Sequence, residues 1–229
     1  EMSAEQLATR IISEQAEISS SKIRRGDITE AEFEKLAACA QHMQTVPLYV
    51  DQTGGISIAS LVARARRLKR QRGLDLLIVD YIQLLSGSQK NSGNRVQEIT
   101  EITTGLKALA KELNVPIIAL SQLSRQVESR EDKRPQLSDL RESGSIEQDA
   151  DVVLFVFREE YYLSKTQPEE GTPEYEAWND KFERVKGKAE VIIAKQRHGP
   201  TGTAQLHFQG EFTRFSDLAE DQYLPERQE

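Results

Sequence analysis

The sequence predicts an α/β fold: a mostly parallel, twisted sheet with helices on both faces and an antiparallel hairpin near its C-terminal end. Three observations support this prediction. Continuous apolar runs, typical of strands buried on both faces, recur at 76–79, 117–120, 152–156 and 191–194. Segments with helical apolar spacing separate several of these runs, as in βαβ units. Segments 203–208 and 212–215 flank a turn at Gln209–Gly210 and predict the hairpin.

Capping signals predict the first helices. Ser3 with Gln6 and Thr29 with Glu32 have the spacing of a capping box, in which the first side chain accepts a backbone hydrogen bond and the second returns one. Each pair therefore predicts a helix start. A short strand is expected at 48–50, after the second of these helices.

Apolar stripes predict two later helices, over 58–68 and 96–113, which Gly73 and Pro116 end. The stretch 159–188 differs because it is polar and contains two prolines. It predicts a surface insertion, partly helical around 175–182.

Composition limits the classes of function. The longest apolar runs fall far short of the ~20 residues that a membrane span needs, so no membrane contact is expected. The single cysteine, Cys39, cannot form an internal disulfide, and a reducing cytoplasm fits best. No Cys/His cluster has the spacing of metal ligands. The formal net charge is −7, so any contact with nucleic acid must be local or pooled from several copies.

In open parallel α/β sheets, ligands bind beyond the carboxyl ends of the strands. The polar residues that follow the predicted strands are Asp80, Ser121–Gln122, Arg158 and Lys195–Gln196–Arg197. Four apolar residues and then Asp80 is the pattern of the acidic strand end that holds Mg²⁺ in nucleotide-hydrolysing domains. A hard cation prefers oxygen ligands, and a rigid strand end fixes where one carboxylate points. The alternative is an aspartate that caps the next turn.

Two further strand ends carry candidate phosphate contacts. Gln122 has a donor and an acceptor on one short side chain and can sense a γ-phosphate, although an ordinary polar loop is the alternative. Lys195 and Arg197 are two residues apart, so they point the same way from a strand. They can reach a triphosphate on a neighbouring subunit, with a solvated surface pair as the alternative.

The polar segment 139–145 precedes a predicted strand. Arg141, Ser143, Ser145 and the Gly144 backbone can contact phosphates of a single nucleic-acid strand, and the alternative is a helix cap with a salt-bridged loop. The basic helix face over 64–72 favours a solvated or subunit-facing helix. The sequence contains no G-x-x-x-x-G-K-[ST] motif, which by itself argues against a nucleotide hydrolase.

Taken together and in this order, these segments resemble the C-terminal RecA-like ATPase domain of the DnaB family of replicative DNA helicases. The matching segments are 1–3, 77–85, 116–125, 139–151 and 194–202. The resemblance runs to about residue 215, and several linked motifs at the right separations make it specific. It implies that the phosphate-binding loop lies upstream of Glu1, so that the chain is truncated after the Walker A motif. Residues 1–217 are expected to form the motor domain, with 159–188 as an insertion and 218–229 as an acidic tail.

The resemblance also implies a P-loop NTPase core and a role for each candidate residue. A homo-hexameric ring would couple ATP hydrolysis at its subunit interfaces to movement along single-stranded DNA and to duplex unwinding, with Mg²⁺ as cofactor and with primase and a helicase loader as further partners. The implied roles are Glu1 as the glutamate that activates water, Asp80 as the Mg²⁺-associated carboxylate acting through water, Gln122 as the γ-phosphate sensor, Lys195 and Arg197 as cations acting on the neighbour's ATP, and Arg141, Glu142 and Gly144 as contacts to DNA. Residues 86–95 are expected to form a second pore-facing loop.

Two alternatives remain open at this point. A RecA-type recombinase or a circadian-clock ATPase shares the core fold, although segments 139–144 and 195–200 favour the helicase. The second alternative is a non-enzymatic interaction module. The isolated chain is expected to be inactive as an ATPase, because the phosphate-binding loop is missing from its sequence.

Overall fold

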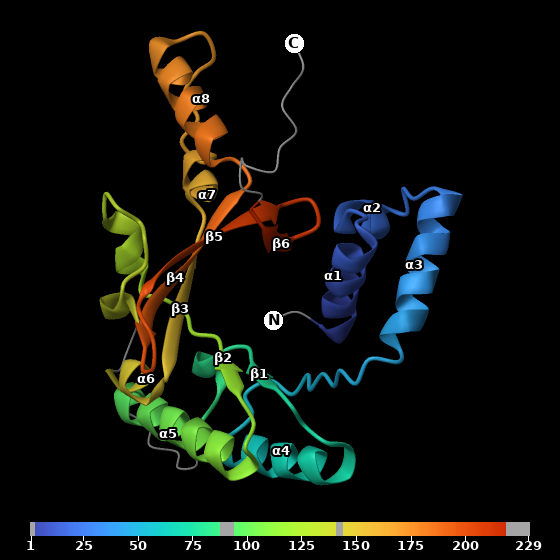
Figure 1. Cartoon of the computed structure of the whole chain (residues 1–229), viewed down its shortest axis with the longest axis vertical. Helices are drawn as coiled ribbons and strands as arrows, with labels where there is room; N and C mark the ends of the chain where they lie inside the picture. The colour runs from blue at the N-terminus through green and yellow to red at the C-terminus, as the bar shows by residue number, and fades with distance from the viewer. Residues whose placement is uncertain (1–2, 88–93, 141–143, 219–229) are drawn as a thin grey trace. The chain divides into compact units, whose positions relative to one another are not determined.

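The computed structural model describes residues 3–87, 94–140 and 144–218 of the chain (Figure 1). The predicted site residues Glu1, Arg141 and Glu142 lie outside these ranges. The chain divides into two compact units. Unit 1 comprises residues 1–52, 157–191 and 204–229, and unit 2 comprises residues 53–156 and 192–203. No helix in the described ranges has the length and apolar character that a membrane span requires.

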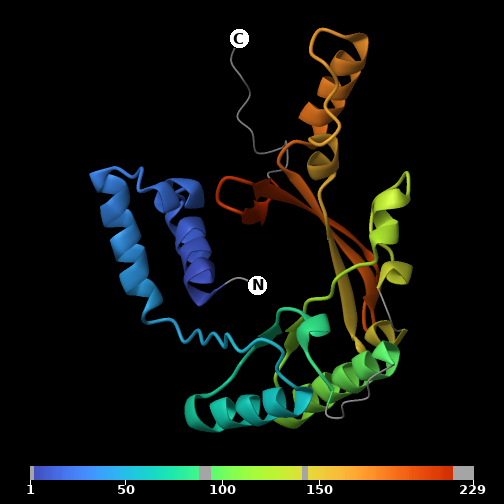
Figure 2. The same cartoon turned by 180° about the vertical axis from the view of Figure 1, so that it is seen from behind.

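Unit 1 begins with the helices α1 (Ala4–Ala16), α2 (Ser20–Arg25) and α3 (Glu30–Met43). Both predicted capping boxes are confirmed, at Ser3 and at Thr29. Helices α1 and α3 lie side by side, as the two opposite views agree (Figure 2). The predicted strand at 48–50 is wrong. These residues belong to no strand and their side chains are about half exposed, because no neighbouring strand among the described residues hydrogen bonds with them.

The insertion predicted at 159–188 contains two helices of unit 1, α7 (Glu159–Leu163) and α8 (Pro173–Val185). The Trp178 indole Nε1 donates a hydrogen bond to the Leu163 carbonyl at 3.0 Å, and its ring stacks on Phe182. The insertion is therefore more helical than predicted, and its aromatic side chains pack on one another.

Unit 2 contains the helices α4 (Ile58–Arg72) and α5 (Arg95–Leu113) and the strands β1 (Leu77–Val79) and β2 (Ile117–Ala119). Its short helices are η1 (Ile82–Leu84), η2 (Arg125–Ser129), η3 (Leu137–Asp139) and α6 (Gly144–Asp149). Gly73 ends α4 with φ 85°, a conformation that glycine adopts without a steric penalty. Strands β1 and β2 are parallel, with Leu77 opposite Ile117.

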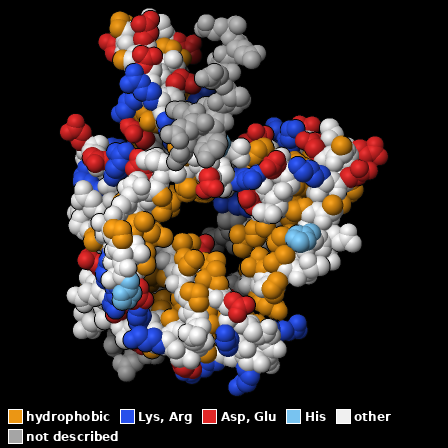
Figure 3. All heavy atoms as spheres, in the orientation of Figure 1, with side chains coloured by type: hydrophobic (Ala, Val, Ile, Leu, Met, Phe, Trp, Pro, Cys, Tyr) orange, Lys and Arg blue, Asp and Glu red, His pale blue; other side chains and the backbone are white. Residues whose placement is uncertain are grey.

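One face of the β1–β2 pair carries the core of unit 2. The core contains Ile99 and Ile102 of α5, both fully buried, together with Ile58, Val79, Ile82, Leu85, Leu106 and Ile146. On the opposite face Ile78 and Ile118 are 57% and 50% exposed, and hydrophobic side chains are visible over these strands (Figure 3). The prediction that these strands are buried on both faces is therefore not met within unit 2.

The remaining strands form a four-stranded sheet in the order β3 (Val152–Phe157), β4 (Lys188–Gln196), β5 (Gly202–Gln209) and β6 (Arg214–Asp217). The predicted hairpin is confirmed, with Phe208 opposite Phe215. Arg197, just after β4, donates its backbone N–H to the carbonyl of Asp151, just before β3, so these strands run in opposite directions. The antiparallel part is larger than predicted, because an apolar run does not reveal the direction of a strand.

Replacing a fully buried core residue tests this assignment of the core. Ile99→Ala removes apolar groups from the centre of unit 2 and should lower the free energy of unfolding by about 2–5 kcal/mol, as large-to-small core substitutions do. Val96→Ala is the matched control on the same helix, because Val96 is 49% exposed and its loss should stay within about 0.5 kcal/mol. Urea unfolding measures both. Equal losses of unfolding free energy in the two variants would contradict the assignment of Ile99 to the core.

An ion pair between α5 and the start of β3 predicts a pH dependence. Lys107 donates a hydrogen bond to the Asp151 carboxylate, and this bond, ahead of charge attraction, holds the pKa of Asp151 below its usual value. A lowered carboxyl pKa stabilises the fold above the ordinary Asp pKa of about 4, and this contribution is lost as pH falls through the lowered value. The stability difference between the wild type and Asp151→Asn, measured by denaturant unfolding from pH 7 to pH 3, should therefore shrink on acidification. A difference that stays constant with pH rejects this role.

Candidate functional site

The ends of β1 and β2 lie at the same edge of unit 2. Val79 is opposite Ala119, so Asp80 is level with the residue that follows β2. The backbone N–H of Leu120 donates to the Val79 carbonyl at 2.9 Å, and that of Ile82 donates to the Leu120 carbonyl at 2.9 Å. The Asp80–Tyr81 peptide bond is cis. The parallel pairing thus places Asp80 and the segment that carries Gln122 at one edge of the sheet, as predicted.

The Asp80 side chain is exposed and forms no hydrogen bond or ion pair with any described residue. Asp80 therefore does not cap the next turn, because a capping carboxylate accepts a hydrogen bond from a backbone N–H. No group of three or more acidic, histidine or cysteine side chains that could hold a metal occurs in the described ranges. A single carboxylate suits Mg²⁺, which usually keeps several waters and takes only one or two carboxylates from a protein.

Gln122 has a fixed backbone and a free side chain. Its backbone N–H donates to Gln83 Oε1 at 3.2 Å, while Gln83 Nε2 donates to Ser121 Oγ at 3.0 Å and lies 3.5 Å from the Gln122 carbonyl. The Gln122 side chain is exposed and has no hydrogen-bond partner among the described residues. Because the backbone is already held, the unpartnered Gln122 side chain can reach a ligand with little further ordering of the backbone.

Gln83 was missed in the sequence analysis, although it follows Asp80 by only three residues. Its carbonyl accepts a hydrogen bond from Arg95 Nη2 at 2.6 Å, and Arg95 pairs with Glu98 at 2.5 Å. The pKa of Glu98 is lowered first by the hydrogen bond from the Gly87 N–H and then by Arg95. These contacts tie the first turn of α5 to the segment after Asp80. The only feature of the sequence that could have indicated this role was the amide side chain of Gln83, close after Asp80.

Lys195 and Arg197 both reach the C-terminal end of α6. Lys195 Nζ donates to the Glu147 carbonyl, and Arg197 Nη2 donates to the Gln148 carbonyl at 3.1 Å. The prediction that both cations point the same way is confirmed. Cations at a helix C-terminus are stabilised by its unpaired carbonyls and by the helix dipole. Neither cation forms a hydrogen bond or ion pair with Asp80 or Gln122 in the described structure.

Helix α6 starts at Gly144, which with Ser145 is a predicted phosphate contact within the described residues. Ile146 packs into the core, and Asp149 Oδ2 accepts a hydrogen bond from Thr103 of α5 at 2.7 Å. The helix is thereby fixed on α5. One end of this helix follows the segment predicted to contact DNA, and the carbonyls near its other end accept hydrogen bonds from Lys195 and Arg197.

Arg158, the remaining strand-end candidate, packs within unit 1. Its guanidinium lies 3.7 Å from the centre of the Phe208 ring and pairs with Glu160 at 3.0 Å. These contacts describe a side chain engaged in local packing rather than one open to a ligand.

Comparisons with known proteins identify the family to which the chain is similar. The family model described as the DnaB-like helicase C-terminal domain matches residues 1–217. The chain is 51% identical to the replicative DNA helicase DnaB of Rickettsia conorii and 44% identical to that of Geobacillus stearothermophilus. Each match covers 95% of this chain and 44% of the relative, so the chain spans less than half the length of these proteins.

Two solved structures resemble the chain at 37% sequence identity. One is an ATPase domain with a TM-score of 0.81, and the match covers 96% of this chain and 72% of that one. The other is a DnaB-like replicative helicase, solved in a study of its interactions with primase, with a TM-score of 0.82 and coverage of 96% of this chain and 49% of that one. The predicted RecA-like α/β fold is confirmed. The chain belongs to the DnaB-like helicase C-terminal domain family.

Proposed function

We propose that this chain is the motor part of a replicative DNA helicase, which hydrolyses ATP at the interfaces of a hexameric ring and moves along single-stranded DNA in the cytoplasm. One observation carries the proposal: the unpartnered Asp80 carboxylate and the Gln122 segment share one edge of a parallel strand pair in the described structure. The match to the helicase family over residues 1–217 favours this reading over a recombinase or a clock ATPase.

Each side chain at this edge has a proposed task. Asp80 would hold Mg²⁺ through water, and Mg²⁺ when bound neutralises charge on the phosphates of ATP. Glu1 would accept a proton from the attacking water, a role taken from the family resemblance. Gln122 would hydrogen bond with the γ-phosphate, which its free amide and fixed backbone support.

The cations would act across a subunit interface. The Arg197 side chain is 46% exposed. Among the described residues it contacts Asp151 and a carbonyl of α6 rather than the Asp80 edge of its own chain. This supports a role for Lys195 and Arg197 on the ATP of the adjoining copy. A trans-acting arginine of this kind contributes about 10³–10⁵ in rate.

The DNA contacts would come from Arg141, Glu142 and Gly144. Gly144 is exposed, and a Cβ added there would meet nothing within 4 Å, which leaves its backbone open to a phosphate. The chain carries a formal net charge of −7, so we place DNA contact at a shared channel where six copies pool their arginines. Primase and a helicase loader are proposed as further partners, the first supported by the solved relative that was studied with primase.

Mixed rings test the shared site. In the complete protein, Arg197→Ala should lower ATP turnover by about 10³-fold or more, and Asp80→Ala should do likewise. Rings assembled from equal amounts of both variants should regain turnover at about a quarter of their interfaces, because one variant supplies Asp80 and the other supplies Arg197. A phosphate-release assay measures this. Mixed rings as inactive as the parent variants would reject catalysis across the interface.

Salt dependence tests the DNA contact. Arg141→Ala in the complete ring should weaken binding to single-stranded DNA of any sequence and should reduce the slope of log affinity against log salt concentration. Fluorescence anisotropy at several salt concentrations measures both quantities. Arg67→Ala removes an equal charge from the exposed face of α4 and should change neither. Equal effects of the two variants would show that only the overall charge matters.

A further inference from the structure

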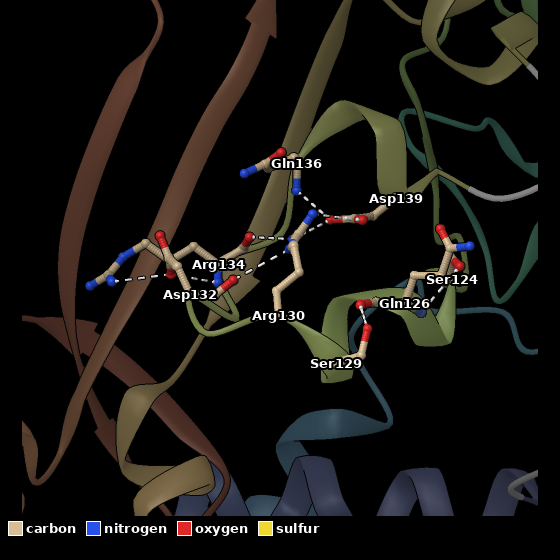
Figure 4. Close-up of polar contacts among 8 residues, drawn as sticks. All are labelled: Ser124, Gln126, Ser129, Arg130, Asp132, Arg134, Gln136 and Asp139. Carbon is tan, nitrogen blue, oxygen red and sulfur yellow. Dashed lines mark hydrogen bonds and ion pairs between the residues drawn. The ribbon is translucent and has the colours of Figure 1, made fainter.

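Residues 124–139 form a closed lobe that follows β2 (Figure 4). Its two ends meet, because Leu123 and Leu140 form an isolated antiparallel bridge. The Ser124 N–H donates to the Asp139 carbonyl at 2.8 Å, next to this bridge. The Ser124 side chain also caps η2, accepting from the Gln126 N–H at 3.3 Å. The lobe is therefore held at its base by backbone hydrogen bonds.

A two-point ion pair locks the lobe. Arg130 Nη1 and Nη2 lie 3.1 and 2.7 Å from the two carboxylate oxygens of Asp139, which is only 3% exposed (Figure 4). Arg130 Nη2 also donates to the Arg134 carbonyl at 2.8 Å, and the Gln136 N–H donates to Asp139 Oδ2 at 2.7 Å. Both charged side chains thus have hydrogen-bond partners. The planar guanidinium contacts both carboxylate oxygens, which fixes the geometry of the pair.

Stability alone is a weak reason for this pair. The Asp139 side chain is 4% exposed and the Arg130 side chain is 29% exposed, so the pair is partly buried. Taking charges out of water is costly, and apolar side chains of similar volume often stabilise a fold as well or better. What a partly buried pair with two contacts adds is a defined geometry. Asp139 lies where that geometry has the most effect, because its carboxylate binds Arg130 while its carbonyl binds Ser124 at the base of the lobe.

The bridge at the base lies between two residues of the proposed mechanism. Gln122 directly precedes Leu123, and Arg141 directly follows Leu140. Leu140 also packs against the hydrophobic core of unit 2. The peptide that carries the proposed phosphate sensor is thereby hydrogen bonded beside the peptide that leads into the proposed DNA contacts.

We propose that Arg130 and Asp139 are positioning residues that couple Gln122 to the DNA-contacting segment. The pair keeps Leu140 on Leu123, so a displacement of Gln122 moves both peptides together. Neither side chain touches the Asp80 edge, so loss of the pair leaves ATP hydrolysis in the absence of DNA largely intact and weakens its response to DNA. This inference rests on the proposed function, since it uses the roles assigned there to Gln122 and Arg141.

The test measures ATP turnover of the complete ring against the concentration of single-stranded oligothymidine. Arg130→Ala and Asp139→Asn should each raise the half-saturating DNA concentration by about tenfold or more, within the usual range of coupling between sites. Turnover without DNA should change by less than about twofold, since the ATP-binding residues are untouched. Arg130→Lys should restore only part of the response, because an ammonium group cannot contact both carboxylate oxygens as a guanidinium does.

Asp132→Ala is the matched control. Asp132 is in the same lobe and pairs with Arg134 at 3.6 Å, but its side chain is 64% exposed and its carboxylate makes no contact with Asp139. The half-saturating DNA concentration of Asp132→Ala should equal that of the wild type. A similar rise in this variant would mean that any change in the lobe has the same effect, and would overturn the specific role of the Arg130–Asp139 pair.

The remaining outcomes separate coupling from stability and from the proposed function. A lowered melting temperature with an unchanged half-saturating DNA concentration would make the pair merely structural and overturn the inference. Should Arg130→Ala fail to assemble, Asp139→Asn decides, because its amide keeps the shape and can still accept from the Gln136 N–H. A wild-type ring that never responds to DNA would overturn the proposed function itself, whereas a responsive wild type with an equally responsive Asp139→Asn rejects only the coupling.

Discussion

The parallel pairing of β1 with β2 is the constraint on which the site depends. Because Val79 is opposite Ala119, both strands end at one edge, and the segments that follow them must turn there together. The amide of Gln83 then spans these segments and binds the backbone of Gln122. A shift of the register by one residue would remove these hydrogen bonds and would turn Val79 away from the core. The geometry of the edge and the packing of unit 2 are therefore fixed by the same few backbone contacts.

Much of this arrangement could be predicted from local patterns. Capping boxes specify a helix start within four residues, and both were confirmed, at Ser3 and Thr29. An apolar run followed by a single acid marks a strand end, and Asp80 lies there, exposed. The linked motifs indicated the family, which the match over residues 1–217 confirms. These signals succeed because each is contained within a short stretch of chain.

Features that depend on distant residues could not be predicted in this way. The segment 48–50 has the composition of a strand but has no partner strand among the described residues, and the direction of β4 against β3 depends on a connection that apolar runs do not describe. The hydrogen bond that the Gln122 N–H donates to Gln83 joins residues 39 positions apart in the sequence. The Arg130–Asp139 pair joins two charged residues among many in a polar loop. The roles of Glu1, Arg141 and Glu142 stay predictions, since these residues lie outside the described ranges.

The position of Lys195 and Arg197 on α6 has a consequence for communication around the proposed ring. Both cations already neutralise carbonyl dipoles of their own chain. If the proposed ring forms, a triphosphate on the adjoining copy would have to compete with these carbonyls, and its binding would leave the last turn of α6 without its capping charges. The same helix begins at Gly144, one of the proposed DNA contacts. In such a ring, nucleotide bound at one subunit would weaken the proposed DNA contact of the next subunit, so that hydrolysis in one subunit after another would be favoured over simultaneous hydrolysis.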